Sequence, residues 1–224
     1  MKITERRSVH LNVDGKPLEG RLTVPKRPLG VALFATGTAG ARHVSFAKSL
    51  AERMRDVRMA TYVMDLVSPV ESSDRSARSD VERLCKRLDM QCDWLRDQDA
   101  VADVPMVLCG MDTGAAVAAE YVPRMRCEPV GVAFLNGRLD LADSGLSGLS
   151  LPLLFFVDTA HKYLLDANRS AYEQAAADHQ QKSLLHDVDK DAVSLVTHWA
   201  LSQVADAGAN LPEDERMDSC HEAF

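Results

Sequence analysis

The first part of the chain has the pattern of a two-stranded hairpin. Apolar and polar positions alternate over Val9–Val13 and again over Leu18–Val24, and Asp14-Gly15 stands between the two runs. Alternation in steps of two is typical of a strand with one buried face, and Asp-Gly is a frequent turn pair. The pattern therefore predicts an N-terminal β-hairpin.

Apolar runs of strand length then alternate with segments of helical spacing. The predicted strands are Gly30–Ala35, Met59–Leu66, Met106–Cys109, Val130–Leu135, Leu151–Val157 and Ser183–Val188. The predicted helices are Phe46–Val57, Val81–Leu95, a small-residue run that includes Ala115–Ala119, Asp166–Ala177 and Ala192–Val204. In the second helix we expect Leu84 and Leu88 to face inward and Arg87 to face outward. The serine-rich stretch Ser68–Ser79 is interpreted as a loop.

This order predicts an α/β fold with a mostly parallel, doubly wound sheet and helices on both faces. Continuously apolar strands suit a parallel sheet that is covered on both sides. We expect one domain over residues 1–204 and an acidic, mobile tail over residues 205–224. Functional residues of such sheets follow the carboxyl ends of the strands.

Composition and charge limit the function classes. The chain has 224 residues, of which 46% are hydrophobic, so it can bury one substantial core. A net charge of -7 gives no electrostatic reason to expect nucleic acid or an anionic membrane as a partner. We see no membrane-spanning run and no signal peptide. The five cysteines form no C-x-x-C pair, so we expect a cytoplasmic protein with no disulfide, metal site or cofactor.

The stretch Gly110–Gly114 has the sequence pattern of a sharp strand-to-helix turn. It reads G-x-D-x-G between a buried strand and an alanine-rich helix. The pattern has the shape of the nucleophile elbow, which is usually G-x-S-x-G, with Asp112 in place of the serine. The middle residue of such a turn is forced towards positive φ, which aspartate tolerates better than most residues.

Several motifs occur in the order found in one branch of the α/β-hydrolases. They are Leu18-Glu19-Gly20 before Val24-Pro25, the Phe34–His43 loop ending in Arg42-His43, Asp65-Leu66 with Pro69, the Gly110–Gly114 turn and Leu165–Arg169. On these motifs the chain resembles the dienelactone-hydrolase-like branch from about Leu18 to Leu201. The resemblance implies an α/β-hydrolase fold without a lid domain, since the connection Asn136–Ser150 is too short to form one. It also implies a site built from a serine nucleophile, a histidine base, an acid and two backbone N–H groups for the oxyanion.

Asp112 occupies the nucleophile position of this resemblance. Some α/β-hydrolases that attack carbon–halogen or epoxide bonds have a carboxylate nucleophile there. The alternative is structural, because Asp112 directly precedes a helix and aspartate is a preferred N-cap residue.

The remaining positions of the resemblance also depart from the family pattern. Alignment on Leu165–Arg169 places His161 at the acid position, with Asp158 as second choice. His186, at the end of the last strand, is the best substitute for the base. The oxyanion loop begins Thr36-Gly37-Thr38 instead of His-Gly, and the backbone of Thr38 and of Thr113 could supply the donors. Asn136 follows the next strand end and completes the candidate pocket.

Nucleophile, acid and base all differ from the family pattern, which favours a degenerate triad. We therefore expect a non-catalytic protein that binds a small-molecule ligand or a protein partner in the old pocket. The first alternative is a hydrolase of a short ester, a lactone or a related substrate, with Asp112 as nucleophile and His161 or His186 activating water. The second is a structural subunit. His and Asp can bind zinc, but no compact ligand spacing predicts a metal here.

Overall fold

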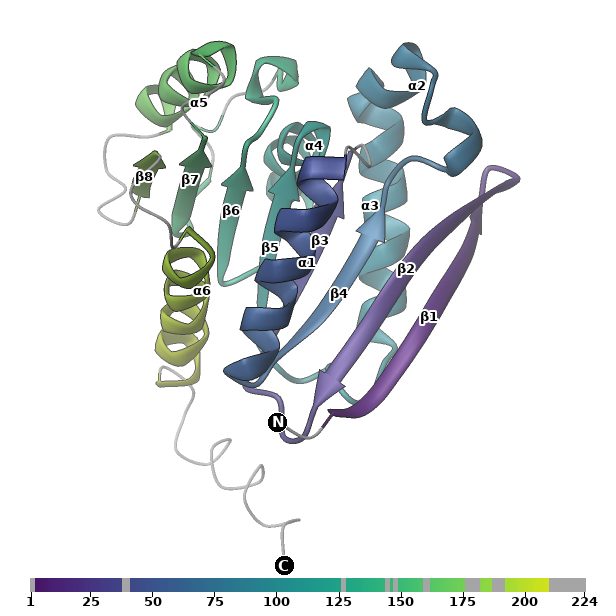
Figure 1. The fold of residues 1–224 in the computed structure, drawn as a ribbon, viewed down its shortest axis with the longest axis vertical. Coiled ribbons are helices and arrows are strands. Elements are labelled where there is room, and N and C mark those ends of the chain that lie inside the picture. The colour runs from purple at the N-terminus through teal and green to yellow at the C-terminus, as the bar shows by residue number, and fades with distance from the viewer. Residues whose placement is uncertain are drawn as a thin grey trace, which may run out of the picture.

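The fold is an eight-stranded sheet with helices on both faces (Figure 1). A computed structural model describes residues 3–37, 41–125, 128–143, 146, 149–158, 162–175, 182–186 and 192–209, with the side chains of 41–44 and 182–186 left outside the description. The strands are β1 Ile3–Val13, β2 Lys16–Pro25, β3 Gly30–Thr36, β4 Met59–Asp65, β5 Met106–Met111, β6 Gly131–Leu135, β7 Leu153–Val157 and β8 Lys182–His186. The helices are α1 Ala41–Asp56, α2 Arg75–Ser79, α3 Val81–Arg96, α4 Thr113–Tyr121, α5 Lys162–Gln174 and α6 Ala192–Ala209.

The strand order is β1-β2-β4-β3-β5-β6-β7-β8. The hairpin β1–β2 joins β4 in the antiparallel direction, and every neighbouring pair from β4 to β8 is parallel. The predicted fold class, including the N-terminal hairpin, is confirmed. From β3 the chain continues to β4 on one side, and β5 to β8 then follow on the other side of β3. The carboxyl ends of β3 and β5 therefore lie at a topological switch point, where ligands bind in such sheets.

Two hydrophobic clusters hold the layers together. Helices α1 and α6 pack on one face of the sheet, and α3, α4 and α5 pack on the other (Figure 1). Helix α4 is buried along its whole length, because its residues are small and it lies between the sheet and α3. The hairpin contributes Val9, Leu22 and Val24 to the cluster on the α3 side only. Its other face therefore carries polar residues.

The structure extends or corrects some predicted boundaries. The stretch Ser68–Ser79, interpreted as a loop, contains a 3-10 turn, Pro69–Glu71, and the short helix α2. Asp74 starts α2 as an N-cap by accepting hydrogen bonds from the N–H groups of Ser76 and Ala77. Helix α6 continues past Val204 to Ala209, where alanine residues favour the helical state. Residues 210–224 lie outside the description, so the acidic tail stays a prediction.

The prediction that Arg87 faces outward is wrong. Its side chain is 0% exposed. The guanidinium donates to both carboxylate oxygens of Glu71, at 2.8 and 3.1 Å, and to the carbonyl oxygen of Leu66 at 2.8 Å. These hydrogen bonds, with those from Ser68, hold the pKa of the Glu71 carboxyl well below its usual range. The pair fixes the segment after β4 against α3.

We expect the substitution Glu71→Ala to lower the free energy of unfolding by about 3–5 kcal/mol, because it leaves the buried charge of Arg87 without its carboxylate partner. Urea unfolding followed by circular dichroism measures this loss. The matched control is Glu82→Ala, since Glu82 is exposed and forms only surface ion pairs with Lys86 and Arg124. The control should cost less than about 1 kcal/mol. Equal losses in the two variants would contradict the structural role of the buried pair.

Candidate functional site

The backbone turns sharply between β5 and α4, and Asp112 stands at the tip of the turn. Its φ is 52° and its ψ is -126°, a combination that non-glycine residues rarely adopt. Such backbone strain costs about 1–3 kcal/mol and is concentrated at functional sites. The Asp112 side chain is partly exposed, in contrast to its neighbours Met111 and Thr113.

Glycines allow this turn because neighbouring backbone leaves no room for a side chain. A Cβ atom on Gly114 would lie 2.1 Å from the carbonyl oxygen of Ala35, and one on Gly110 would lie 2.6 Å from the carbonyl oxygen of Gly114. A Cβ on Gly37 would lie 2.5 Å from Cβ of Thr113. The end of β3 and the start of α4 are therefore in direct backbone contact.

The Asp112 side chain does not cap helix α4. It accepts no N-terminal N–H hydrogen bond of the kind that defines an N-cap. The backbone carbonyl of Asp112 is instead the acceptor for two N–H groups, those of Ala115 at 3.1 Å and Arg138 at 3.0 Å. The N-cap role considered for Asp112 therefore lacks its defining hydrogen bond from an N–H group at the start of α4.

A cluster that the sequence interpretation missed adjoins Asp112. The guanidinium of Arg138 donates to both oxygens of Asp140, each at 2.8 Å, and lies over the ring of Tyr163. The Tyr163 hydroxyl donates to Asp140 at 2.6 Å. The pKa of Arg138 is raised above its usual range, chiefly by the bond to Asp140 and in part by the charge of Asp112. The sequence Arg-x-Asp directly after the strand end at Leu135 is the feature from which this cluster could have been predicted.

Asn136 joins the ends of two neighbouring strands. Its φ is 49°, and its side-chain oxygen accepts the N–H of Asp158 at 2.7 Å. Its own N–H donates to the carbonyl oxygen of Phe156 at 2.8 Å. The structure therefore places the predicted residues Asn136 and Asp158 together, and gives the Asn136 side chain a structural contact.

Thr36 and Asp65 form a second pair at the strand ends. The Thr36 hydroxyl lies 2.7 Å from the Asp65 carboxylate and 3.0 Å from the carbonyl oxygen of Met64. Burial is the main cause that raises the pKa of Asp65. The N–H of Gly37 donates to the carbonyl oxygen of Met111 at 3.3 Å. Of the two predicted oxyanion donors, Thr113 is the first residue of α4, where N–H groups lack helical partners, and Thr38 lies outside the described residues.

The predicted acid and base are not tested by these contacts. His161 lies outside the described residues. The backbone of His186 pairs with Val157 in the sheet, but its side chain is not described. Within the described ranges, no group of three His, Cys, Asp or Glu residues could hold a metal ion. No described helix is long and apolar enough to cross a membrane.

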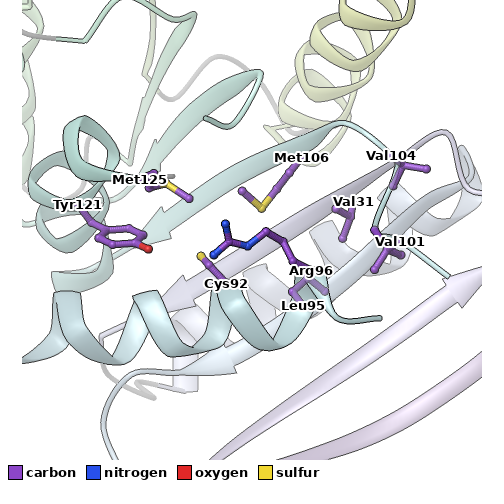
Figure 2. A pocket seen from close by; sticks show the side chains of 10 residues that line it. Val31, Cys92, Leu95, Arg96, Val101, Val104, Met106, Tyr121 and Met125 are labelled. Atoms are coloured by element: carbon purple, nitrogen blue, oxygen red, sulfur yellow. The ribbon is translucent and has the colours of Figure 1, made fainter. Parts of the chain in front are cut away.

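A small pocket lies at the opposite, amino end of the strands. Figure 2 shows Val31 and Met106, from the starts of β3 and β5, facing Cys92 and Leu95 of α3, with the Arg96 side chain reaching between them. The pocket holds about 40 Å³, which is room for only a few water molecules. It carries none of the residues at the strand carboxyl ends and is not part of the candidate site.

Comparison with known proteins places this geometry in a fold. No protein-family model matches the chain. Proteins from two Mycobacterium tuberculosis strains, CDC 1551 / Oshkosh and ATCC 25618 / H37Rv, are 33% identical over 155 residues, which is 69% of this chain and 35% of each relative. Both are named as phosphoribosyl transferases. The chain thus spans about a third of the length of these curated relatives.

The similar solved structures are α/β-hydrolases. Dienelactone hydrolase from Anabaena variabilis has a TM-score of 0.74 and 24% identity, covering 89% of this chain and 95% of that one. Est1E from Butyrivibrio proteoclasticus has a TM-score of 0.69 and 12% identity, with coverage of 88% and 99%. XC6422 from Xanthomonas campestris, a serine hydrolase without a lid, has a TM-score of 0.67 and 16% identity, with coverage of 91% and 95%. The chain has the α/β-hydrolase fold in its dienelactone-hydrolase-like form.

We expect Gly114→Ala to lower the free energy of unfolding by about 3 kcal/mol or more, because the new methyl group would overlap the backbone of Ala35. Gly208→Ala is the control, since a Cβ there meets nothing within 4 Å and alanine favours the helix by about 1 kcal/mol. Urea unfolding of both variants provides the comparison. If Gly114→Ala is as stable as Gly208→Ala, the turn does not pack as described.

We also expect Asp112→Gly to be more stable than Asp112→Ala by about 1–3 kcal/mol, because both remove the carboxylate but only glycine adopts this backbone conformation without strain. At an ordinary helical position the order is the reverse, by about 0.5–1 kcal/mol. Thermal unfolding of the two variants decides the sign. Alanine as the more stable residue would show that the turn is not strained.

Proposed function

We propose that the chain is a non-catalytic protein of the α/β-hydrolase fold, and that it binds a small polar ligand where the hydrolases of this fold bind their substrates. The observation that carries the proposal is the carboxylate of Asp112 at the tip of the β5–α4 turn. In this interpretation the turn is a nucleophile elbow that keeps its backbone shape, while the residue that it presents is a binding group.

Acyl-transfer chemistry supports a binding role for Asp112. When a carboxylate adds to an ester carbonyl, the adduct can expel either the alkoxide or the carboxylate. The carboxylate is much the weaker base, so the adduct returns to the starting ester. Serine avoids this outcome because its alkoxide is as basic as the group that it displaces, and it also needs a histidine to take its proton. Asp112 can therefore bind an ester more readily than it can cleave one.

The surroundings of Asp112 favour a ligand that carries hydrogen-bond donors. The carboxylate is partly exposed at the strand ends, where ligands of open α/β sheets bind. The charge of Asp112 contributes to the raised pKa of Arg138, so the two groups lie close together. Carboxylate oxygens accept hydrogen bonds, so a hydroxyl or amine group is the part of a ligand that Asp112 would recognise.

The name of the mycobacterial relatives does not decide the activity of this chain. The matched 155 residues make up only 35% of each relative, and the name describes the whole protein. The described residues have the layers of an α/β-hydrolase, and the similar solved structures include a serine hydrolase and a dienelactone hydrolase. We therefore base the proposal on the site rather than on that name.

One observation favours a second candidate, a hydrolase with Asp112 as nucleophile. The strained turn aims a carboxylate outward, as a displacement reaction would require. Such an enzyme would act on a short ester, a lactone or a related substrate with a displaceable group, and His161 or His186 would activate water. Turnover in ¹⁸O-labelled water would then place ¹⁸O in the Asp112 side chain, which mass spectrometry of the Asp112 peptide detects. Labelling during turnover would replace the binding proposal with this one.

We expect the wild-type protein to hydrolyse p-nitrophenyl acetate and a five-membered lactone no faster than the variant Asp112→Ala, because the carboxylate does not support acyl transfer. Initial rates over a range of substrate concentrations measure this. Saturable hydrolysis that disappears in Asp112→Ala would contradict the proposal.

The variant Asp112→Ser tests the rest of the triad. It restores the usual nucleophile, and we expect it to remain inactive because the acid and base positions have also changed. Asp143→Ser is the matched control, since Asp143 is exposed on the loop after β6. Activity in Asp112→Ser alone would show that a working base and acid are present, and that only the nucleophile separates this chain from a hydrolase.

A further inference from the structure

A polar groove lies beside the candidate site, on the face of the hairpin that no described helix covers. It encloses about 520 Å³ between helix α1 and the strands β1, β2 and β4. Figure 1 shows α1 crossing in front of the sheet while β1 and β2 extend beyond it. The hairpin buries its apolar residues on the α3 side, so its polar residues face the groove. The alternation of apolar and polar residues that predicted the hairpin therefore also places the polar residues of β1 and β2 in the wall of the groove.

One end of the groove is basic. Arg6 of β1, Arg21 of β2 and Arg55 of α1 all line it. Arg6 pairs with Thr23 and Arg21 pairs with Ser8 in the antiparallel register, so the two arginines are diagonal neighbours on one face. Such positions lie about 7–8 Å apart, within reach of long side chains. The guanidinium of Arg55 donates to the hydroxyl of Thr61 at 3.1 Å, which holds it at the floor of the groove.

These positive charges are incompletely neutralised. Arg6 and Arg21 form no ion pair with any residue in the described ranges, although Arg7, on the opposite face of β1, pairs with Glu5 at 2.6 Å. Burial is the main cause that lowers the pKa of Arg55, and the charges of Arg6 and Arg21 lower it further. The carboxylate of Glu52, which also lines the groove, is the largest single charge effect on Arg55 and acts in the opposite direction, as does that of Asp56. An anion between the three guanidinium groups would relieve their repulsion.

The other end of the groove carries acceptor groups. Glu19 of β2 and Asp65 of β4 line it together with His10 of β1. His10 is the register partner of Glu19, and the charge of Glu19 contributes to the raised pKa of Asp65, so the three groups are close to one another. Four residues of strand separate Arg6 from His10, which corresponds to about 13 Å. The groove therefore has a basic end and an acidic end at the spacing of a small molecule.

We propose that this groove binds a phosphate monoester of a small hydroxylated molecule, with the phosphate at Arg6, Arg21 and Arg55 and the hydroxyl groups at Glu19 and Asp65. Arginine forks match phosphate oxygens in pairs, and a phosphate near neutral pH carries more charge than a single carboxylate. Carboxylates accept hydrogen bonds from hydroxyl groups, which suits the acidic end. The site is separate from Asp112 and does not depend on the function proposed for it.

Titration calorimetry of the purified chain tests this site with glucose 6-phosphate, inorganic phosphate and glucose as probes. We expect glucose 6-phosphate to bind more tightly than inorganic phosphate, and glucose not to bind measurably. Arg21→Gln and Arg6→Gln should each weaken glucose 6-phosphate binding at least tenfold. The matched control Arg7→Gln removes the same charge from the opposite face of β1 and should leave the affinity within twofold.

One further variant separates the two ends of the groove. Glu19→Gln should weaken glucose 6-phosphate binding more than inorganic phosphate binding. Absence of glucose 6-phosphate binding by the wild type at millimolar concentration would overturn the proposal. An equal effect of Arg7→Gln and Arg21→Gln would also overturn it, since the attraction would then come from net charge. Circular dichroism of each variant confirms that it is folded.

Discussion

The direct backbone contact between the β5–α4 turn and the end of β3 is the constraint on which the site depends. Gly114 lies against Ala35, and Gly110 lies against the start of α4, with no space for a side chain at either position. This packing forces the residue between them into positive φ and turns its side chain outward. The shape of the turn therefore does not depend on which residue stands at its tip. The same backbone can therefore present different side chains at this position.

Charge pairing differs between three parts of the molecule, and the difference indicates what each part does. Arg87 is buried and donates to both carboxylate oxygens of Glu71, which makes the two residues a structural ion pair. Arg138 is held by Asp140 beside Asp112, where it shapes the electrostatic field of the site. In the groove, Arg6 and Arg21 have no paired carboxylate among the described residues. Positive charge without a partner in a concave site is an arrangement that an anionic ligand can complete.

The fold of this chain shows which proteins it is similar to, whereas its activity depends on the residues of its site. The sheet order and the similar solved structures are those of the dienelactone-hydrolase-like form of the fold. The residues at the strand ends belong to this chain, and Asp112 stands in its β5–α4 turn, where the usual pattern has a serine. A shared fold hosts many activities, so the site decides between hydrolysis and binding. The groove beside α1 is a second concave region, and it is lined by other residues than Asp112.

The sequence by itself determined the order of strands and helices, the hairpin and the β5–α4 turn, because these follow from local periodicity. It also determined that Thr36, Asp112 and Asn136 stand at strand ends, because parallel strands run in one direction. Only the tertiary structure decided that Arg87 is buried, that Arg138 joins Asp140 and Tyr163, and that no helix among the described residues covers one face of the hairpin. An arginine on a helix looks exposed in sequence because its charge is costly to bury alone. Its partner, Glu71, comes from a different segment, and periodicity within one helix carries no information about which segments the fold brings together.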